Sequence, residues 1–333
     1  MEELQMSPEE LLEPWKIPFA ETVDEEDIFY FFRLLFGRIP SELEWYCHKT
    51  FSGKKVSEIF ASYVASEEFK KRLSAQGIRS DMPVRKVDLG EVSFYLPEGD
   101  HAVGEVIFGT NTYEPNVFSV FRSIVKEGMT FLDIGANLGW YSIWGSHFLG
   151  GMGKVLAVEA GLQNANFLLA NKALNKAENI EIFHVAALDE FSLLSYSSAY
   201  SNGFVRKAEI PESGATFGKE IVQGVPLDSL LSEKLKIGLV KIDIEGSEYR
   251  ALLGMEKTLK KWKPTILSEY SPLLLQEFSR VSGEQYVRRI LSLGYEMRLV
   301  DNDGTVAEIF VEQLDDELKK AKSDHLDLLF LPA

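Results

Sequence analysis

Cysteine is almost absent from this chain. Cys47 is the only one among 333 residues, so no disulfide can form within the chain. Basic residues are also few, because 35 Lys and Arg stand against 51 Asp and Glu and the formal net charge is −16. Proteins that follow nucleic-acid phosphates or bind broadly to anionic lipid carry the opposite charge. The composition therefore predicts no nucleic-acid partner, while a local basic pocket stays compatible with it.

Long apolar runs are missing too. No stretch of the sequence approaches the ~20 apolar residues that a membrane-spanning helix needs. The N-terminal segment, MEELQMSPEELLEPWKIPFA, is acidic and interrupted by proline, and it lacks the basic start and apolar run of a secretory signal. We expect a cytoplasmic protein without a membrane span, in which residues 1–20 form a flexible acidic leader. The sequence predicts no particular oligomeric state.

Helical spacing of apolar residues begins after this leader. Between residues 21 and 80, apolar side chains recur three and four positions apart, as at Ile28 and Phe32, which predicts a small all-α module. Residues 33–40, RLLFGRIP, together with residues 65–69, ASEEF, are similar to a short helical repeat of bacterial surface and carbohydrate-modifying proteins. A helical cap that packs on the main domain is the simpler interpretation of this module.

The rest of the chain predicts a hairpin followed by a large α/β domain. In residues 81–115, apolar and polar residues alternate as far as Ile107, and Gly90 is a turn signal. This pattern indicates a β-hairpin and a connection at the edge of the larger domain. Residues 116–333 alternate strand and helix patterns, which predicts a mostly parallel seven-stranded sheet with helices on both faces. The strand segments are TFLDIGA, KVLAVEA, IEIFHVAAL, GLVKIDIEG, PTILSEY, YEMRLVD and LDLLFLPA. Ligands of such sheets bind at the carboxyl ends of the strands.

The first of these strands runs into a glycine-bearing turn, DIGANLG. A dinucleotide fingerprint would have glycine where Asn137 stands, which counts against a nicotinamide-dependent oxidoreductase. Asp133, inside the strand, would repel a pyrophosphate but suits a cationic group such as an ammonium. Gly135 and Gly139 allow the backbone to come close to a ligand. Glu159 ends the second strand, at about the distance expected for an acid that accepts ribose hydroxyls.

A site with one carboxylate that binds an amino group and another that binds a ribose fits S-adenosylmethionine. A surface turn with an ordinary terminal acid is the plainer alternative. The further motifs are NKALN, AALDE, VPLDSLL, KIDIEGSE and ILSEY, in this order. Together with DIGANLG and Glu159 they resemble the FkbM family of S-adenosylmethionine-dependent methyltransferases, from about Tyr113 to the C-terminus.

The resemblance implies a class I methyltransferase (Rossmann-like) fold and, often, O-methylation of a hydroxyl on a sugar or polyketide-like product. The cofactor-binding positions that it implies are Glu114, Asp133, Gly135, Ala136, Asn137, Gly139, Glu159, Ala160, Ala187 and Asp243. Glu114, beside Tyr113, is expected to close over the methionine end of the cofactor. The chain departs from the family at Ala160, where proline is typical, so the shape of that loop differs.

The catalytic candidates follow the fourth strand segment. Side chains alternate along a strand, so Lys241, Asp243 and Glu245 are expected to share one face. An alcohol acceptor needs a base, and Asp243 and Glu245 come first, followed by Glu269 at the end of the next strand. The alternative for Lys241 and Asp243 is a structural ion pair. These carboxylates could also coordinate a divalent ion, but the sequence has no dense cluster of Asp or His that would mark a metal site.

The predicted function is S-adenosylmethionine-dependent O-methylation of a sugar, glycan or small metabolite. A nicotinamide-dependent oxidoreductase and a non-catalytic, methyltransferase-like interaction protein remain as alternatives. The Ser-, Gly- and Tyr-rich segment after AALDE is expected to shape the acceptor pocket, unless it is only a solvated loop or hairpin. Its candidate acceptor contacts are Tyr196, Tyr200, Asn202 and Arg206, and His101 is a further one.

Overall fold

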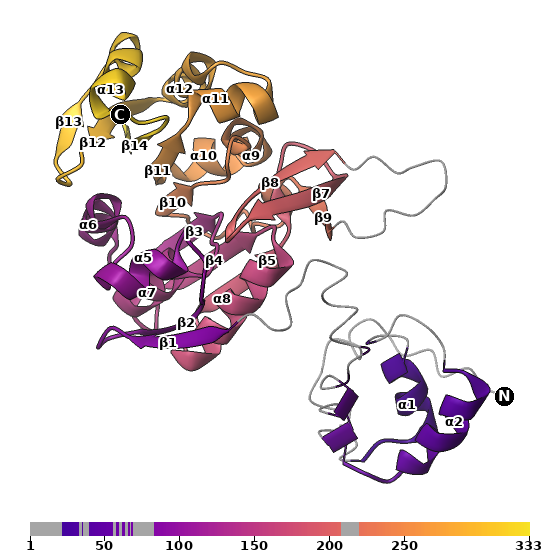
Figure 1. Cartoon of the computed structure of the whole chain (residues 1–333). Coiled ribbons are helices and arrows are strands. Elements are labelled where there is room, and N and C mark those ends of the chain that lie inside the picture. Colours follow the sequence, from indigo (N-terminus) through magenta and orange to yellow (C-terminus); the bar gives the residue numbers. More distant parts are fainter. Residues whose placement is uncertain are drawn as a thin grey trace. The chain divides into compact units, whose positions relative to one another are not determined.

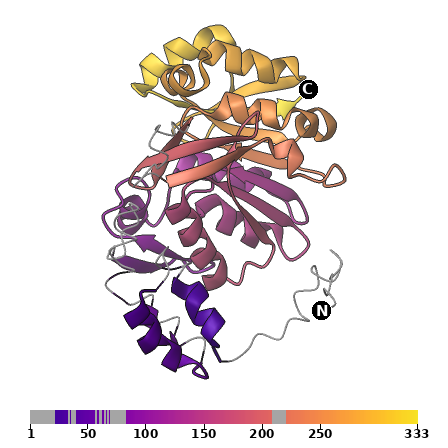
Figure 2. The same cartoon turned by 90° about the vertical axis from the view of Figure 1, so that its right-hand side faces the viewer.

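The computed structural model describes residues 22–32, 35, 40–55, 58, 59, 62, 63, 66 and 68 in its N-terminal part, and then residues 83–207 and 220–333. The predicted acidic leader lies outside the described residues. The chain divides into two compact units, Met1–Ser80 and Asp81–Ala333, and each is described by itself (Figures 1 and 2).

The described part of the first unit is helical, as its apolar spacing predicts. Its elements are α1 (Glu25–Phe31), α2 (Glu42–His48) and the short 3₁₀ helix η3 (Lys49–Phe51). Ser41 and Glu44 form a reciprocal capping box that begins α2. Val23, Ile28, Phe32, Ile59 and Tyr63 form a small buried cluster. This unit therefore has an apolar core of its own.

The second unit is built on a sheet that has eight strands in the described part of the chain, in the order β13-β12-β14-β11-β10-β3-β4-β5. Its strands are β3 (Thr130–Ile134), β4 (Lys154–Glu159), β5 (Ile180–His184), β10 (Leu239–Ile242), β11 (Thr265–Tyr270), β12 (Tyr295–Val300), β13 (Val306–Glu308) and β14 (Leu326–Pro332). The strands from β5 to β11 pair in parallel, and β14, β12 and β13 pair antiparallel. All seven predicted strands are present, and the short β13 extends the sheet at its edge.

Helices cover both faces of this sheet, as predicted (Figure 1). One face packs against α5 (Gly104–Thr110), α6 (Pro115–Ile124), α7 (Trp140–Leu149) and α8 (Leu162–Leu174). The other face packs against α9 (Glu248–Gly254), α10 (Glu256–Trp262), α12 (Gly283–Ser292) and α13 (Leu314–Ala321). The remaining short helices are η4 (Leu227–Ser229), α11 (Pro272–Leu274), the π-helix η5 (Leu275–Ser279) and η6 (Val311–Gln313). In the ranges that the structure describes, none of the helices is long and apolar enough to cross a bilayer.

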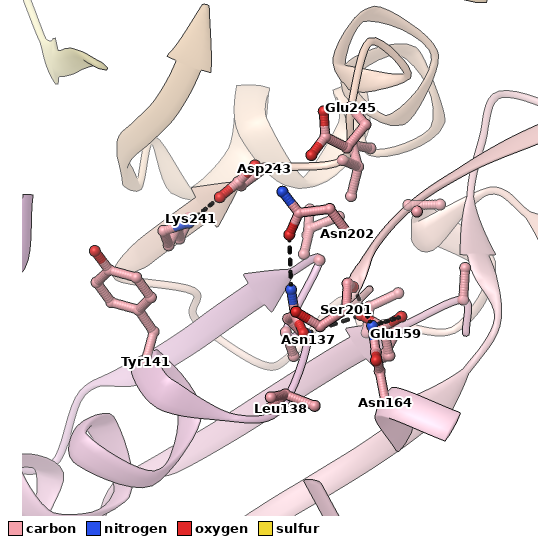
Figure 3. A pocket seen from close by; sticks show the side chains of 18 of the residues that line it. Asn137, Leu138, Tyr141, Glu159, Asn164, Ser201, Asn202, Lys241, Asp243 and Glu245 are labelled. Carbon is pink, nitrogen blue, oxygen red and sulfur yellow. Dashed lines mark hydrogen bonds and ion pairs between the residues drawn. The ribbon is translucent and has the colours of Figure 1, made fainter. Parts of the chain in front are cut away.

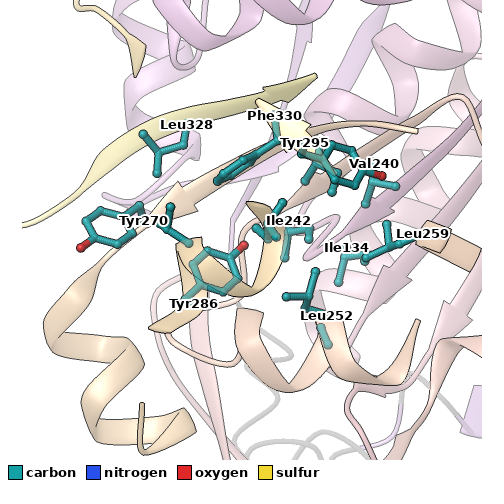
Figure 4. Packing of buried hydrophobic residues seen from close by; sticks show 14 of the residues in the cluster. Ile134, Val240, Ile242, Leu252, Leu259, Tyr270, Tyr286, Tyr295, Leu328 and Phe330 are labelled. Atoms are coloured by element: carbon teal, nitrogen blue, oxygen red, sulfur yellow. The ribbon is translucent and has the colours of Figure 1, made fainter. Parts of the chain in front are cut away.

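Successive side chains of the buried strands point to opposite faces of the sheet, and both faces are apolar. Figure 4 shows Val240 and Ile242 of β10 pointing toward Leu252 of α9 and Tyr286 of α12, all of them fully or almost fully buried. The intervening residues of the same strands, such as Leu239, belong to the cluster on the opposite face. Each fully buried aliphatic side chain contributes about 1.5–3 kcal/mol, so both helical layers are needed for stability.

The predicted hairpin is present, as β1 (Val84–Asp88) and β2 (Ser93–Pro97) around Gly90. Two features differ from the prediction. The alternating pattern does not continue to Ile107, because α5 begins at Gly104. The hairpin is also a separate two-stranded sheet and not an edge of the main one. Asn171 and Asn175 of α8 accept hydrogen bonds from the backbone of β2, at 2.6 and 2.8 Å, which holds the hairpin against that helix.

The segment after AALDE forms a second, smaller sheet. The predicted strand IEIFHVAAL is divided into β5 and the two-residue β6 (Ala186–Ala187), which pairs with β9 (Glu220–Val225). β7 (Ser192–Ala199) and β8 (Asn202–Lys207) form an antiparallel hairpin beside β9. Figure 2 shows these strands, in pink and salmon, in front of the main sheet. The segment is therefore an ordered hairpin in its described part.

Candidate active site

A pocket opens at the carboxyl ends of β3, β4, β10 and β11. About 920 Å³ of space there, including space open to solvent, is free of protein atoms. The predicted residues that line it are Glu114, Gly135, Ala136, Asn137, Glu159, Ala160, Ala187, Lys241, Asp243, Glu245 and Glu269. Figure 3 shows Asn137 and Glu159 on one side of this pocket and Lys241, Asp243 and Glu245 on the other. The structure thus brings together most of the residues that the motifs indicated.

The glycine turn depends on left-handed backbone. Gly135 has φ +85°, and a Cβ placed on it would lie 1.8 Å from the carbonyl oxygen of Asp243. The turn after β3 and the loop after β10 therefore touch at Gly135, and no other residue type fits there. Gly139 has φ +97° and begins α7, where a Cβ would meet Leu168 at 2.5 Å. Gly139 does not line the pocket, so its role is in packing and not in ligand contact.

Asp133 is not among the residues that line the pocket, and its contact with an ammonium group stays a prediction. Its side chain is buried on β3 and accepts a hydrogen bond of 2.6 Å from the Ser142 hydroxyl. Burial raises the pKa of Asp133 to about 6, although Lys241 and Ser142 favour the ionised form. Because it does not line the pocket, Asp133 acts on the site through Lys241 and Ser142.

Glu159 joins the loops that follow β3 and β4. Its carboxylate accepts hydrogen bonds from the backbone N–H groups of Asn137 at 2.8 Å and Gly161 at 2.7 Å. Burial raises the pKa of Glu159 to about 7, and these two hydrogen bonds oppose the rise. The Asn164 side-chain amide donates a third, longer hydrogen bond of 3.4 Å. A carboxylate has about four acceptor positions, so one remains for a hydroxyl of a ligand. The position and remaining capacity of Glu159 fit the predicted ribose contact.

Lys241 is the buried cation of the site. Its ammonium group lies 2.8 Å from the Asp243 carboxylate and 4.5 Å from the ring centre of Tyr141. The Tyr141 hydroxyl donates a hydrogen bond of 2.7 Å to Glu114, which begins α6 with a left-handed backbone. Burial lowers the pKa of Lys241, but Asp243, Glu114 and Asp133 outweigh this effect and raise it. Lys241 and Asp243 therefore form the ion pair that the sequence left as an alternative.

We expect Lys241→Met to lower the free energy of unfolding by about 3–5 kcal/mol, because it leaves Asp243 and Asp133 without their buried counter-ion. Urea unfolding followed by circular dichroism measures this. The matched control is Lys154→Met, which removes an exposed pair with Glu181 at 3.1 Å and should cost no more than about 1 kcal/mol. Equal losses in both variants would show that the buried pair contributes nothing special.

Glu245 reaches the pocket in a different way from the one predicted. Strand alternation ends at Ile242, and Glu245 has a left-handed backbone with φ +51°. The turn continues through Gly246 (φ +94°), while Glu248 accepts hydrogen bonds from the N–H groups of Ile244 and Gly246 at 3.1 and 3.0 Å. Within the described ranges the Glu245 carboxylate has no hydrogen-bond or ion-pair partner. Burial, and then Asp243, raise the pKa of Glu245 to about 7.

Asp327 is the register partner of a pocket residue, and the sequence analysis missed it. It lies on β14 directly opposite Glu269 of β11 in the antiparallel register. Burial is the main cause that raises the pKa of both groups, to about 7 for Asp327 and well above the usual glutamate value for Glu269. The one sequence feature that could have pointed to Asp327 is that this acid stands inside the apolar segment LDLLFLPA. Only the position of β14 beside β11 shows that this acid meets the pocket residues.

The β7–β8 hairpin forms one wall of the pocket. Tyr196 and Asn202 line it, as expected for this segment, and Asn137 donates a hydrogen bond of 3.4 Å to Asn202. Tyr200 and Arg206 do not line it. Tyr200 packs edge-on against His101 with ring centres 5.1 Å apart, and Arg206 pairs with Glu277 at 2.6 Å. His101 is likewise outside the pocket lining.

Two asparagines of α8 support the loops around the pocket. Asn171 of α8 donates a hydrogen bond of 2.8 Å to the carbonyl oxygen of Leu138, so the NKALN motif supports the glycine turn. Asn164 donates one of 2.7 Å to the carbonyl oxygen of Ser201 and so ties α8 to the hairpin tip. Among the residues that the structure describes, no three His, Cys, Asp or Glu side chains are arranged to hold a metal ion.

Three features are typical of a class I methyltransferase. They are a mostly parallel sheet with helices on both faces, a glycine turn after the first strand, and an acid at the end of the second strand that suits a diol. Residues 133–297 match the methyltransferase FkbM domain. The chain therefore carries a methyltransferase domain of the FkbM family, and its cofactor is S-adenosylmethionine. This confirms the resemblance from the sequence. No curated protein sequence matches the chain.

Several solved methyltransferase structures are similar to this chain. Methyltransferase FkbM from Methylobacillus flagellatus KT is 18% identical with a TM-score of 0.38, covering 61% of this chain and 43% of its own. A SAM-dependent methyltransferase from Aquifex aeolicus is 17% identical with a TM-score of 0.34, covering 65% and 88%. The O-methyltransferase from Bacillus cereus in complex with SAH is 13% identical with a TM-score of 0.38, covering 69% and 88%. This chain thus spans less than half the length of the Methylobacillus protein.

Proposed function

We propose that this domain transfers a methyl group from S-adenosylmethionine to a hydroxyl oxygen of a sugar, glycan or other small metabolite. The observation that carries the proposal is Glu245, an unpartnered carboxyl group with a pKa of about 7 in the same pocket as Glu159. A general base works best when its pKa lies near the operating pH. An alcohol needs such a base, because it attacks well only as its proton leaves.

The residues of the pocket fit the cofactor. Glu159 has one free acceptor position for a ribose hydroxyl, and Val158, Val185 and Ala187 supply apolar surface for a purine ring. The oxygen of the Asn137 side chain is buried and has no partner, so an unused acceptor lies in the glycine turn. Asp243 and Glu114 supply negative charge for the ammonium group.

When bound, the cofactor supplies an electrophilic methyl group on a positively charged sulfur. The protein has then to orient the acceptor and remove its proton. Glu245 is the better base, since Asp243 is held in an ion pair of 2.8 Å with Lys241. Lys241 and Asp243 are proposed to fix the shape of the pocket floor. Glu269 lines the same pocket, and burial and then Asp243 raise its pKa.

We expect Glu159→Gln to weaken S-adenosylmethionine binding by roughly 10- to 150-fold, the value of about 1.5–3 kcal/mol for a hydrogen bond to a charged group. Isothermal titration calorimetry measures the affinity, and titration with NADH in parallel tests the oxidoreductase alternative. The control is Glu181→Gln on the neighbouring strand β5, whose exposed carboxylate pairs with Lys154. An unchanged affinity in a folded Glu159→Gln variant, or tight NADH binding, would contradict the cofactor site.

The acceptor class is tested by methyl transfer from isotopically labelled S-adenosylmethionine to a panel of mono- and oligosaccharides, hydroxy acids and matched amines. The proposal expects labelled methyl ethers, identified by mass spectrometry and by the NMR shift of the O-methyl carbon. Methylation on nitrogen or carbon alone would reject the hydroxyl acceptor and keep the methyltransferase assignment.

A further inference from the structure

Three carboxyl groups stand side by side on neighbouring strands at the pocket end of the sheet. Glu269 of β11 and Asp327 of β14 are directly opposite in the antiparallel register. Opposed side chains of this kind have Cβ atoms ~4.5–5.5 Å apart and lie on the same face. Ile242 of β10 is paired with Ser268, so Asp243, the next residue, lies beside Glu269. We call Glu269 and Asp327 the carboxyl pair.

The charge around the carboxyl pair is strongly unbalanced. The titratable groups that interact electrostatically with the pair are Tyr113 and Glu114 at the start of α6, Tyr141 on α7, Lys241 on β10, Asp243, Glu245 and Glu248 between the end of β10 and the start of α9, and His325 before β14. Lys241 is already paired with Asp243 at 2.8 Å. His325 is half exposed and pairs with Asp324 at 2.9 Å.

Two like charges so close together cannot both ionise at low cost. Ionisation of one carboxyl group therefore disfavours ionisation of the other, and the two groups titrate as a unit. The raised pKa values agree with this, because burial is the main cause for both groups and other carboxylates add to it. Within the described residues neither side chain has a hydrogen-bond or ion-pair partner. Lys241 and His325 lower the pKa of Asp327, but burial and Glu114 outweigh them.

The carboxyl pair lies on the side of the pocket toward which the cofactor must extend. Glu159, the proposed ribose acceptor, stands at the end of β4, and the strand order continues through β3 and β10 to β11. Glu269 lines the same pocket as Glu159 and Asp243. A positive charge held between these strands is only weakly screened from the pair, because the surroundings are partly buried.

We propose that the carboxyl pair Glu269–Asp327 releases a proton when the cationic sulfonium cofactor binds and retains that proton when the neutral thioether product is bound. This inference rests on the proposed function of the pocket. It gives Asp327 a role that neither the motifs nor the family match indicates. Glu269 and Asp327 would thus distinguish cofactor from product by the charge on sulfur.

The proposal also accounts for the charge balance of methyl transfer. The carbon–sulfur bond breaks and a carbon–oxygen bond forms, while sulfur keeps the bonding electron pair and loses its positive charge. The proton of the acceptor hydroxyl goes to Glu245. The carboxyl pair, no longer facing a cation, can then take up a proton from Glu245 or from solvent. The pocket therefore keeps nearly the same net charge before and after the reaction.

The test is calorimetric titration of the full chain at pH 7 in two buffers of different ionisation enthalpy, phosphate and Tris. The ligands are S-adenosylmethionine and S-adenosylhomocysteine, which differ by the methyl group and the charge on sulfur. The number of protons released on binding follows from the change of the observed enthalpy with the ionisation enthalpy of the buffer. We expect S-adenosylmethionine to release at least ~0.5 proton more than S-adenosylhomocysteine. Equal counts for the two ligands would overturn the inference while leaving the cofactor assignment intact.

Three variants locate the source of the proton. Glu269→Gln and Asp327→Asn should each remove most of the difference between the two ligands, whereas Glu245→Gln should retain it. The matched control is Glu296→Gln, which alters an exposed carboxyl group paired with Arg298 on β12 of the same sheet. Loss of the difference only in Glu245→Gln would assign the proton to that residue and reject the pair. Absence of S-adenosylmethionine binding to the unmodified chain would instead reject the proposed function itself.

Discussion

Gly135→Ala should remove measurable S-adenosylmethionine binding and lower the free energy of unfolding by about 3 kcal/mol or more. The new Cβ would lie 1.8 Å from the carbonyl oxygen of Asp243 and 2.9 Å from the Ile244 side chain. The turn after β3 and the loop after β10 would have to separate, and both contribute to the pocket. Overpacking costs ~1–3 kcal/mol, and the left-handed backbone at φ +85° adds ~1–2 kcal/mol for a residue with a side chain.

The control separates these two causes. Gly128 has a similar left-handed backbone, with φ +76°, but no heavy atom lies within 4 Å of an added Cβ. Gly128→Ala should therefore show only the backbone cost of ~1–2 kcal/mol and bind cofactor normally. Chemical denaturation and calorimetric titration of both variants measure the difference. A Gly135→Ala variant as stable and as tight-binding as Gly128→Ala would mean that the two loops do not meet at this point.

Glu245→Gln should slow methyl transfer by at least ~100-fold, the usual contribution of a general base, and should change cofactor affinity little. The substitution keeps the shape of the side chain but removes its capacity to accept a proton. Because burial and Asp243 raise the pKa of Glu245 to about 7, the wild-type rate should increase as pH rises through 7 and then level off. Single-turnover assays with an acceptor found by screening give the rate at each pH.

The pH profile distinguishes a base from a residue that only shapes the turn. In Glu245→Gln the inflection near pH 7 should vanish, and the residual rate should keep rising at high pH as the acceptor ionises without help. Glu296→Gln, an exposed carboxyl substitution on β12, should retain the full wild-type profile. If Glu245→Gln kept the inflection and a near-normal rate, Glu245 would be structural and the carboxyl pair would become the candidate for the base.

The sequence by itself determined the type of most elements and the position of the cofactor turn. Apolar alternation and helical spacing are local properties, so they predicted seven strands of the main sheet and the helices on both faces. Gly135 and Glu159 were found because a left-handed turn and a strand-end acid depend on few neighbours. The same local rule failed at Glu245, where the left-handed turn, and not strand alternation, directs the side chain.

Only the tertiary structure decided which of the predicted acids meet the ligand pocket. Asp133 and Gly139 belong to the diagnostic motif, yet packing of α7 and α8 places them outside the pocket lining. Asp327 is near the end of the chain and lies opposite Glu269 because β14 inserts between β11 and β12. Strand order depends on contacts between residues far apart in sequence, which no local pattern records. The burial that raises the pKa of Glu269 and Asp327 therefore arises only when the sheet is assembled.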